Sequence, residues 1–528
     1  MPAAYPPKTS QQQAEVPLFA LPVQVEGSAR TVTVDRLLEG PPTYQIGSLA
    51  RRAALWTFGL MVGGYLLSMA ATAVLARILT ATDYGIMGMV MTLSAFFYVF
   101  SDMGLSWAIV QKRGLTRGQV DNLFWINVAA GTSLWGACFV AGPLLNRFYG
   151  RPELARIAVV LGAGFLLSGL AAQPRALLQR QMRQKAISVI AIIAQTGGAV
   201  AGVCLALEGF GYWALVAQSL SAQTIVVLLL FKHTGYRPGL PSTGQGIKTM
   251  VSYGGYAIAY EVMNYFAQNL DNVLIGRVWG TEQLGYYSRA YFLMMLPLML
   301  AVGAVHPVMV PCLSALSHDR ERMAEAYRKA VALTGAIAFP LTIGLAVTAP
   351  EAIRLIYGPK WAPVVPLLFW LSIGGISLPV YNTMYWLYLA SGKSRSMFYW
   401  GLGSTAALAG GFSVGLNWGP IGVAIAYALV MGLFLTVPGL YYGHRSADIS
   451  LRATLRTVTP FFAAAIFMGI LVTAASHLLA AMGTDWRVVL VLKISIGIVV
   501  YTGICKHRLT PLFNDIVLGL KTHVASHR

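Results

Sequence analysis

The chain has 528 residues, of which 56% are hydrophobic and only 11% are charged, and its mean hydropathy is +0.63. This composition excludes a soluble protein of this length and is typical of a chain that lies in a bilayer. The formal net charge of +19 would suggest nucleic-acid binding in a soluble protein, but here the basic residues lie between apolar segments, as in membrane proteins. The four cysteines lie in or at the ends of apolar runs, without a CxxC pair or histidines at metal-ligand spacing, so no disulfide framework, metal site or cofactor is expected.

The first 48 residues are rich in proline and glutamine. Their apolar stretch at residues 16–23 is short and broken by prolines, so it does not indicate a cleaved signal. We expect residues 1–48 to form a disordered cytoplasmic extension.

Fourteen apolar segments follow, and a transmembrane helix needs roughly 20 such residues. The segments begin near residues 53, 86, 120, 155, 186, 211, 249, 285, 329, 362, 396, 419, 457 and 487. The tenth is the least regular, because Pro363, Pro366 and Pro379 interrupt it. The sequence therefore predicts an all-α integral membrane protein with about fourteen transmembrane helices.

Basic residues are distributed unequally between alternate loops. If the N-terminus is cytoplasmic, the even-numbered loops carry nineteen Lys and Arg residues, whereas the odd-numbered loops and the adjoining helix ends carry nine. Cytoplasmic loops carry such an excess in membrane proteins. We therefore expect both termini and the loop at 175–185 to be cytoplasmic, and the loop at 147–152 to be periplasmic.

A short element occurs twice, 200 residues apart. Residues 77–85 (RILTATDYG) return as residues 277–285 (RVWGTEQLG), and each copy ends one apolar segment and begins another. Six helices separate the copies, and an even number preserves orientation, so we expect two parallel repeats with a substrate site between them. The expected organisation is a six-helix lobe at 50–231, a cytoplasmic linker at 232–248, a second six-helix lobe at 249–443, two additional helices at 444–505 and a basic cytoplasmic tail at 506–528.

The seventh apolar segment has the most polar face. At about 100° per residue, six of its side chains fall within an arc of roughly 120°: Glu261, Asn264, Tyr265, Gln268, Asp271 and Asn272. An ionisable group inside the membrane costs roughly 3 kcal/mol, so this face needs water, a partner charge or a polar ligand. Two interpretations are open, namely the lining of a water-filled cavity and an interhelical hydrogen-bond seam.

Charged residues elsewhere in the membrane have both structural and functional interpretations. Asp102 is either a cavity acid or a buried acid that neighbouring groups satisfy. Arg77 and Arg277 end their helices, where they either snorkel to the membrane surface or contact a ligand. Arg289 lies one turn into the eighth helix, where it could pair with Asp271.

Two further residues lie within apolar segments. Lys493 is expected to snorkel to the membrane surface. His306 could suggest a membrane acyltransferase, but a lone histidine is more simply explained by a hydrogen bond to the next helix.

Four motifs occur in a fixed order: Leu75–Leu79 with Asp83–Gly85, Ser101–Leu105 with Gln111, Gly211–Val216, and Asp271–Arg277 through Leu284–Tyr291. Over about residues 48–445 the chain thereby resembles the Wzx-type flippases, the polysaccharide-export branch of the multidrug/oligosaccharidyl-lipid/polysaccharide exporter superfamily. It looks most similar to members that export colanic-acid-like exopolysaccharide units. The proline-rich extension departs from the short N-terminus that is usual in this family.

The resemblance implies a transporter of the bacterial inner membrane and not an enzyme. Its cargo would be an undecaprenyl-pyrophosphate-linked oligosaccharide repeat unit, moved from the cytoplasmic to the periplasmic leaflet by alternating access. Proton or sodium coupling is compatible with this role but not required by it, and contacts with a polysaccharide polymerase and export machinery are compatible with it as well. The candidate cavity residues are Arg77, Asp102, Glu261, Asn264, Tyr265, Gln268, Asp271, Asn272, Arg277 and Arg289. Among them the arginines are candidates for the pyrophosphate, and the acids are candidates for ion coupling.

Two other function classes stay open. A drug or cation exporter of the same superfamily would need a more apolar and acidic cavity. A polysaccharide polymerase would need a sizeable periplasmic loop, whereas the longest periplasmic stretch here, at about 350–361, is short. An integral glycosyltransferase often carries a DxD metal site, and the nearest approximation, residues 319–321, is typical of a solvated, salt-bridged helix.

Overall fold

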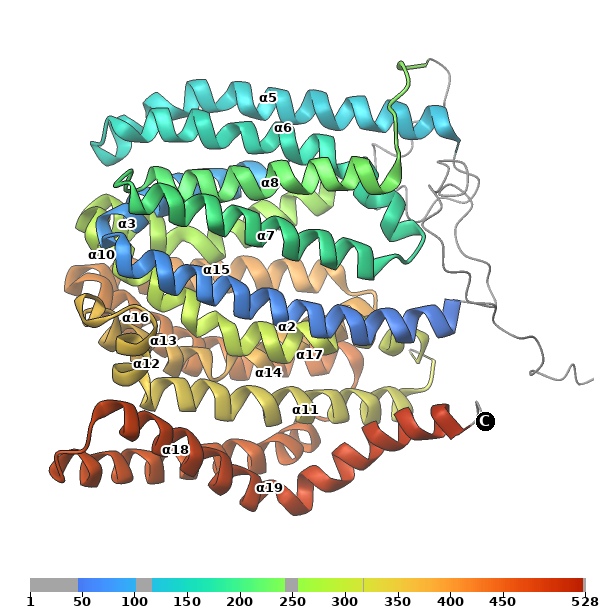
Figure 1. Ribbon diagram of the computed structural model, residues 1–528. Helices are drawn as coiled ribbons and strands as arrows, with labels where there is room; N and C mark the ends of the chain where they lie inside the picture. Colours follow the sequence, from blue (N-terminus) through green and yellow to red (C-terminus); the bar gives the residue numbers. More distant parts are fainter. Residues whose placement is uncertain (1–45, 101–115, 243–254, 317, 526–528) are drawn as a thin grey trace, which may run out of the picture.

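The computed structural model describes residues 46–100, 116–242, 255–316 and 318–525. Helices make up most of these residues, and no strand occurs among them, which confirms the all-α prediction. Figure 1 shows long helices lying side by side in one bundle, with the beginning of the first helix and the end of the last at the same end. We call this the termini end and the other the opposite end. Most of the predicted extension, and Asp102, lie outside the described residues.

The helices fall into two groups and a C-terminal pair. The first group contains α2 (Ile46–Ile78), α3 (Ala81–Tyr98), α5 (Arg117–Tyr149), α6 (Glu153–Arg180), α7 (Gln184–Leu207) and α8 (Trp213–Thr234). The second contains α10 (Gly255–Ala315), α11 (Arg320–Val347), α12 (Ala349–Ile356), η3 (Pro359–Trp361), α13 (Val364–Gly375), α14 (Leu378–Ala390), α15 (Ser394–Gly415), η4 (Leu416–Trp418), α16 (Gly419–Leu429), η5 (Val430–Leu435) and α17 (Thr436–Ala447). The pair is α18 (Leu451–Ala481) and α19 (Trp486–Ala525). Ten segments of the described chain are long and apolar enough to cross a membrane, which supports a multi-pass protein, while the number fourteen stays a prediction.

Glycine and proline set the helix breaks in the second group. α10 covers two of the predicted spans, and its path turns at Gly280, whose φ of 81° is left-handed. The irregular tenth span is divided, because α13 ends at Gly375 and α14 begins at Leu378. Pro379 lies in the first turn of α14. Backbone N–H groups in the first turn have no acceptor within the helix, so the missing N–H of proline costs no hydrogen bond there. At both positions the sequence signal marks where regular helical hydrogen bonding is interrupted.

The two copies of the repeated element pack against each other at the opposite end (Figure 1). Gly85 of α3 lies against Thr281, and a Cβ atom on it would come within 1.7 Å of the Thr281 carbonyl oxygen. Gly285 makes the reciprocal contact, with 1.9 Å between an added Cβ and the Ala81 carbonyl oxygen. Neither glycine has a positive φ, so the requirement here is for space and not for an unusual backbone conformation. The internal repeat thus forms a backbone-to-backbone contact between the two groups.

A set of hydrogen bonds, which we call the latch, joins the groups at the same end. The last carbonyls of a helix lack partners within that helix, and for α2 the partners come from the second group. Lys360 Nζ donates to the carbonyl oxygens of Arg77 and Leu79 at 2.9 and 2.7 Å. Trp361 Nε1 donates to the Ala76 carbonyl oxygen at 2.8 Å. The C-terminus of α2 is therefore capped across the interface between the groups.

The first part of the predicted linker lies along α5. The Asn122 side chain makes two hydrogen bonds with the backbone of Ser242, at 2.6 and 2.8 Å. The Tyr236 hydroxyl donates to Asp121 at 2.6 Å. Burial raises the pKa of Tyr236, and the hydrogen bond to the Asp121 carboxylate raises it further, so the hydroxyl stays protonated as a donor. Residues 235–242 are thus held by the first group.

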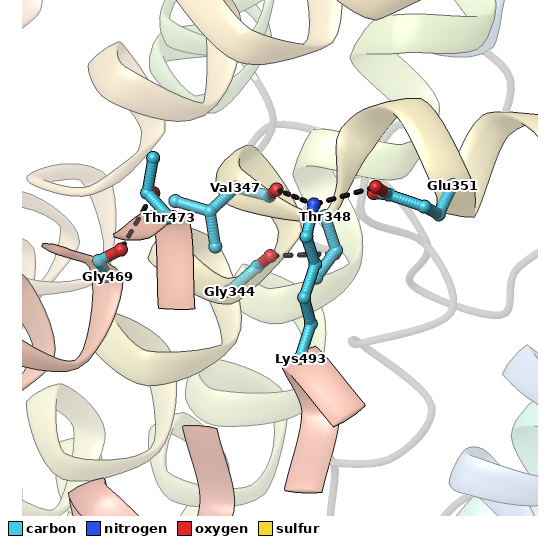
Figure 2. A network of polar contacts seen from close by, with 7 residues as sticks. All are labelled: Gly344, Val347, Thr348, Glu351, Gly469, Thr473 and Lys493. Carbon is cyan, nitrogen blue, oxygen red and sulfur yellow. Dashed lines mark hydrogen bonds and ion pairs between the residues drawn. The ribbon is translucent and has the colours of Figure 1, made fainter. Parts of the chain in front are cut away.

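The C-terminal pair is fixed to the second group by a buried ion pair (Figure 2). Lys493 of α19 is 4% exposed, and its ammonium donates to Glu351 Oε1 at 2.7 Å and to the Val347 carbonyl oxygen at 3.2 Å. The expectation that Lys493 snorkels is therefore wrong. The reason is tertiary: α19 packs on α11 and α12, and α12 brings a carboxylate to a lysine that cannot reach the surface.

We expect Gly85→Ala to lower the midpoint of thermal unfolding of the detergent-purified protein. The added methyl group must displace the Thr281 backbone, and overpacking costs about 1–3 kcal/mol. Gly63→Ala in α2 is the matched control, because a Cβ there meets nothing within 4 Å and alanine favours the helix. Equal midpoints for Gly85→Ala and wild type in a fluorescence-monitored melt would contradict the close approach.

The Lys493–Glu351 pair provides a second stability test. Glu351→Gln leaves a buried ammonium without a counter-charge, and breaking such a pair costs about 3–5 kcal/mol. Replacing both residues, Lys493→Met with Glu351→Leu, should restore most of the unfolding midpoint, since an apolar pair of similar volume is often as stable. If the decreases in unfolding midpoint of the single variants Lys493→Met and Glu351→Leu simply add in the double variant, the two residues are not coupled.

Candidate functional site

A cavity of about 840 Å³ lies between the first group and α10. Its wall comes from α2, α3, α6, α7 and α8 on one side and from α10 on the other. Ligand pockets in proteins have volumes of about 300–1,000 Å³. The amide, hydroxyl and guanidinium groups on its wall include those of Gln195, Gln218, Ser219, Gln223, Asn269, Asn272, Ser288 and Arg289. The cavity is thus a ligand-sized space whose largely apolar wall carries a set of amide, hydroxyl and guanidinium groups.

Three glutamines of the first group, Gln195 on α7 with Gln218 and Gln223 on α8, form what we call the amide wall. The Gln223 side chain packs against Gly164 of α6, where a Cβ would come within 2.7 Å of its Oε1. Gln223 Nε2 donates to Ser219 Oγ at 3.3 Å, but its buried Oε1 accepts no hydrogen bond from the described residues. A buried acceptor without a partner costs about 1–3 kcal/mol. The Gln223 amide is therefore incompletely hydrogen-bonded at the wall of the cavity.

Arg289 is the one charged residue among the described residues that line the cavity. Its Cζ lies 4.5 Å from the ring centroid of Tyr84 and 5.4 Å from that of Phe292. These ring faces hold the guanidinium without occupying its N–H donors. Its buried Nε has no partner, and no described carboxylate pairs with it. Such a planar set of free donors matches the geometry of a phosphate or a carboxylate.

The polar stripe predicted on the seventh segment divides between two surfaces of α10. Asn272 lines the cavity. Asp271 is 2% exposed and does not line it; its carboxylate instead accepts a hydrogen bond from the Tyr287 hydroxyl at 2.8 Å. The buried Tyr265 hydroxyl donates to the Thr92 carbonyl oxygen at 2.9 Å, across the interface with the first group. One helix face thus contributes both to a hydrogen-bond seam and to a cavity wall.

The remaining stripe residues do not line the cavity in the described part of the chain. Gln268 is exposed and is not a lining residue. The side chains of Glu261 and Asn264, like Asp102, lie outside the described residues, so their roles stay predictions. Asn269, which the stripe does not include, does line the cavity. The cavity borders only part of the roughly 120° arc predicted for this helix. Which side chains of the arc line it depends on how the neighbouring helices pack.

The arginine candidates lie in two places. Arg289 lines the cavity, and it forms no ion pair with Asp271, because that buried carboxylate accepts a hydrogen bond from Tyr287 instead. Arg77 and Arg277 lie at the opposite end, away from the cavity wall. Arg77 donates to a backbone carbonyl of α12 at 2.5 Å, and Arg277 is exposed with its Cζ 5.7 Å from the Phe148 ring.

The sequence pattern does not indicate the amide wall, because its three glutamines form no polar stripe on a single helix. The available signal was weaker: three glutamines inside two otherwise apolar spans, at 195, 218 and 223. The structural interpretation of His306 is supported, since Trp386 Nε1 donates to its Nδ1 at 2.6 Å, from α14 to α10.

Comparison with known proteins gives one matching family. A family model described as polysaccharide biosynthesis protein matches residues 74–366. The teichuronic acid biosynthesis protein TuaB of Bacillus subtilis is 27% identical over 344 residues, which cover 63% of this chain and 69% of that protein. The lipopolysaccharide biosynthesis protein WzxC of Escherichia coli is 26% identical over 371 residues, with coverages of 69% and 75%. The succinoglycan biosynthesis transport protein ExoT of Rhizobium meliloti is 25% identical over 464 residues, with coverages of 87% and 93%.

Solved structures of membrane transporters have the same fold. The lipid II flippase MurJ in an inward closed conformation superposes with a TM-score of 0.69 at 16% identity, covering 87% of this chain and 99% of that one. An inward-facing multidrug resistance transporter of the MATE family superposes with a TM-score of 0.60 at 16% identity, covering 76% and 99%. At these identities the likeness concerns the fold alone, and it confirms the expected exporter-type helical architecture.

Proposed function

The chain belongs to the family of polysaccharide biosynthesis proteins, whose model matches more than half of it, and we propose that within this family it is a transporter and not an enzyme. Its cargo is an undecaprenyl-pyrophosphate-linked oligosaccharide repeat unit, which it moves from the cytoplasmic to the periplasmic leaflet of the bacterial inner membrane. Relatives named for polysaccharide biosynthesis and transport support this assignment.

The observation that carries the proposal is a cavity of about 840 Å³ whose polar groups are amides, hydroxyls and one guanidinium. Burying one unpaired hydroxyl in hydrocarbon costs roughly 2–7 kcal/mol, so a sugar unit with many hydroxyls cannot cross a bilayer unaided. The amide wall supplies both donors and acceptors to replace the lost water. The lipid tail of the cargo stays in the bilayer.

We assign the termini end to the cytoplasm and the opposite end to the periplasm, on the basis of the excess of basic residues in the even-numbered loops. In this orientation the latch closes the periplasmic end. Residues 50–231 and 249–443 then act as two lobes that move relative to each other, so that the latch and the contact between the repeated elements open when the periplasmic end opens. Alternating access of this kind places the substrate between the repeats.

Arg289 is our candidate for the pyrophosphate, because its donors face the cavity and have no described acidic partner. Outward movement of negative charge is favoured by about 2.3 kcal/mol per charge per 100 mV, so an anionic cargo moves with the membrane potential. Asp271 is a candidate for proton or sodium coupling, because it is a buried carboxyl held by a tyrosine and not by a cation. Contacts with a polymerase and export machinery belong to the same proposal.

A drug or cation exporter of the same fold is the alternative. The lining of the cavity argues against it, because its described residues include a guanidinium and no carboxylate. Such a wall repels organic cations and attracts anionic or neutral polar cargo. The superfamily branch that handles lipid-linked sugars therefore fits this chemistry better.

Loss of the protein should stop polymer export and leave lipid-linked repeat units on the cytoplasmic leaflet, because their synthesis precedes the missing step. Mass spectrometry of lipid extracts, combined with an impermeant sugar-oxidising reagent on intact cells, measures both quantities. Turnover of a sugar nucleotide by the purified protein would replace the transporter proposal with an enzyme.

Variants of the cavity separate transport from stability. Gln223→Leu and Arg289→Gln should each reduce export about tenfold, the effect of losing one or two buried hydrogen bonds to cargo. Gln223→Leu should at the same time keep or raise the unfolding midpoint, because it removes a buried acceptor that has no partner.

Gln173→Leu is the matched control for these variants, since that glutamine is also buried with no described partner but lies away from the cavity. It should raise the unfolding midpoint and leave export unchanged. Full export by both Gln223→Leu and Arg289→Gln would remove the cavity from the transport path.

A further inference from the structure

A second hollow, of about 600 Å³, lies between α14, α15 and α17. From this hollow α15 runs to η4, where the Leu416 carbonyl oxygen accepts a hydrogen bond from Trp279 near the opposite end. The hollow therefore lies at the termini end, and it shares no lining residue with the cavity. Its wall contains two cations, Lys393 and Arg445, and no carboxylate among its described lining residues. We call it the aromatic–basic hollow, because its other large side chains are Tyr388, Tyr399, Trp400 and Tyr442.

The two cations come from different elements and have no described acidic partner. Lys393 precedes α15 as its N-cap, and Arg445 lies in the last turn of α17. Neither takes part in an ion pair or hydrogen bond of its side chain within the described chain. Two uncompensated positive charges facing one hollow favour an anionic occupant.

In a neighbouring hollow, by contrast, acids accompany the bases. That hollow is lined by Arg320 and Arg322 together with acids. Arg320 pairs with Asp448 at 3.3 Å, and Arg322 pairs with Asp319 at 3.2 Å. Its bases are neutralised by the chain itself, whereas those of the aromatic–basic hollow are not.

Side chains of the aromatic–basic hollow are held in place without a ligand. Tyr388 is 1% exposed and lines the hollow, yet its hydroxyl has no hydrogen-bond partner among the described residues. Trp400 is held by a hydrogen bond from its Nε1 to the Tyr381 hydroxyl at 3.0 Å, and its ring lies 5.5 Å from that of Tyr442. The N-terminus of α15 has no side-chain cap, so its free N–H groups add positive potential.

We propose that the aromatic–basic hollow binds the phosphate group of a membrane lipid at the termini end. Tyr399 and Tyr442 are exposed at its rim. Tyrosine is suited to the boundary between headgroups and acyl chains, because its ring can contact the acyl chains while its hydroxyl contacts water. Basic pockets between transmembrane helices bind phosphate headgroups. An anionic phospholipid and a polyprenyl phosphate share this chemistry, and the proposal covers both without depending on the cargo of the central cavity.

The test is native mass spectrometry of the full-length protein released from detergent, titrated with phosphatidylglycerol or with undecaprenyl phosphate. The variant Lys393→Gln/Arg445→Gln should bind the retained lipid about tenfold more weakly, because two charge-assisted contacts are lost. Tyr388→Phe should weaken binding by a smaller factor. The double variant Arg320→Gln/Arg322→Gln removes the same charge from the compensated hollow and should bind like wild type.

The lipids distinguish the two sources. Preferential retention of phosphatidylglycerol assigns the site to bulk phospholipid, and preferential retention of undecaprenyl phosphate assigns it to the carrier. Equal binding by wild type and Lys393→Gln/Arg445→Gln would overturn the proposal, and so would an equal loss in the Arg320→Gln/Arg322→Gln control. Binding of soluble pyrophosphate with neither lipid retained would overturn the lipid assignment.

Discussion

Two glycines at equivalent positions of an internal repeat set the distance between the helix groups. At Gly85 and Gly285 backbone meets backbone, and even a methyl group would overlap a carbonyl oxygen. Small residues are the usual means of bringing membrane helices together, because lipid provides little hydrophobic drive for association. The close approach brings α3 and α10 together, and with them the two walls of the cavity. It also places the latch residues within hydrogen-bonding distance of α2.

Different kinds of polar group line the two hollows of the bundle. The central cavity presents amides and one guanidinium, whereas the aromatic–basic hollow at the termini end presents two cations and aromatic rings. The aromatic–basic hollow thus holds two cations at the termini end, whereas the cavity presents mostly neutral hydrogen-bonding groups.

Local patterns in the sequence predicted much of the fold, since hydropathy and helix breakers act within one segment. Gly280 and Pro379 mark real interruptions, and the repeated element marks the interface between the groups. The candidate site was harder to predict from the sequence. Helical periodicity shows which side chains share a face of a helix, but not which other helix or cavity that face contacts. Asp271 and Asn272 are adjacent in sequence, yet one faces a tyrosine and the other the cavity. Lys493 shows the same limit, since its partner lies 142 residues earlier on α12.

The capping of α2 has a consequence for the energy difference between conformations. Its terminal carbonyls accept from the buried Trp361 and, at the exposed edge of the bundle, from Lys360 of the other group. Water at a membrane surface can replace such hydrogen bonds at little net cost, because a hydrogen bond in folding exchanges one partner for another. The same bonds in the hydrocarbon layer would cost several kcal/mol to break. Solvent can therefore complete the helix end where Lys360 releases it, whereas release of the buried Trp361 bond is the step that costs free energy when the two halves part.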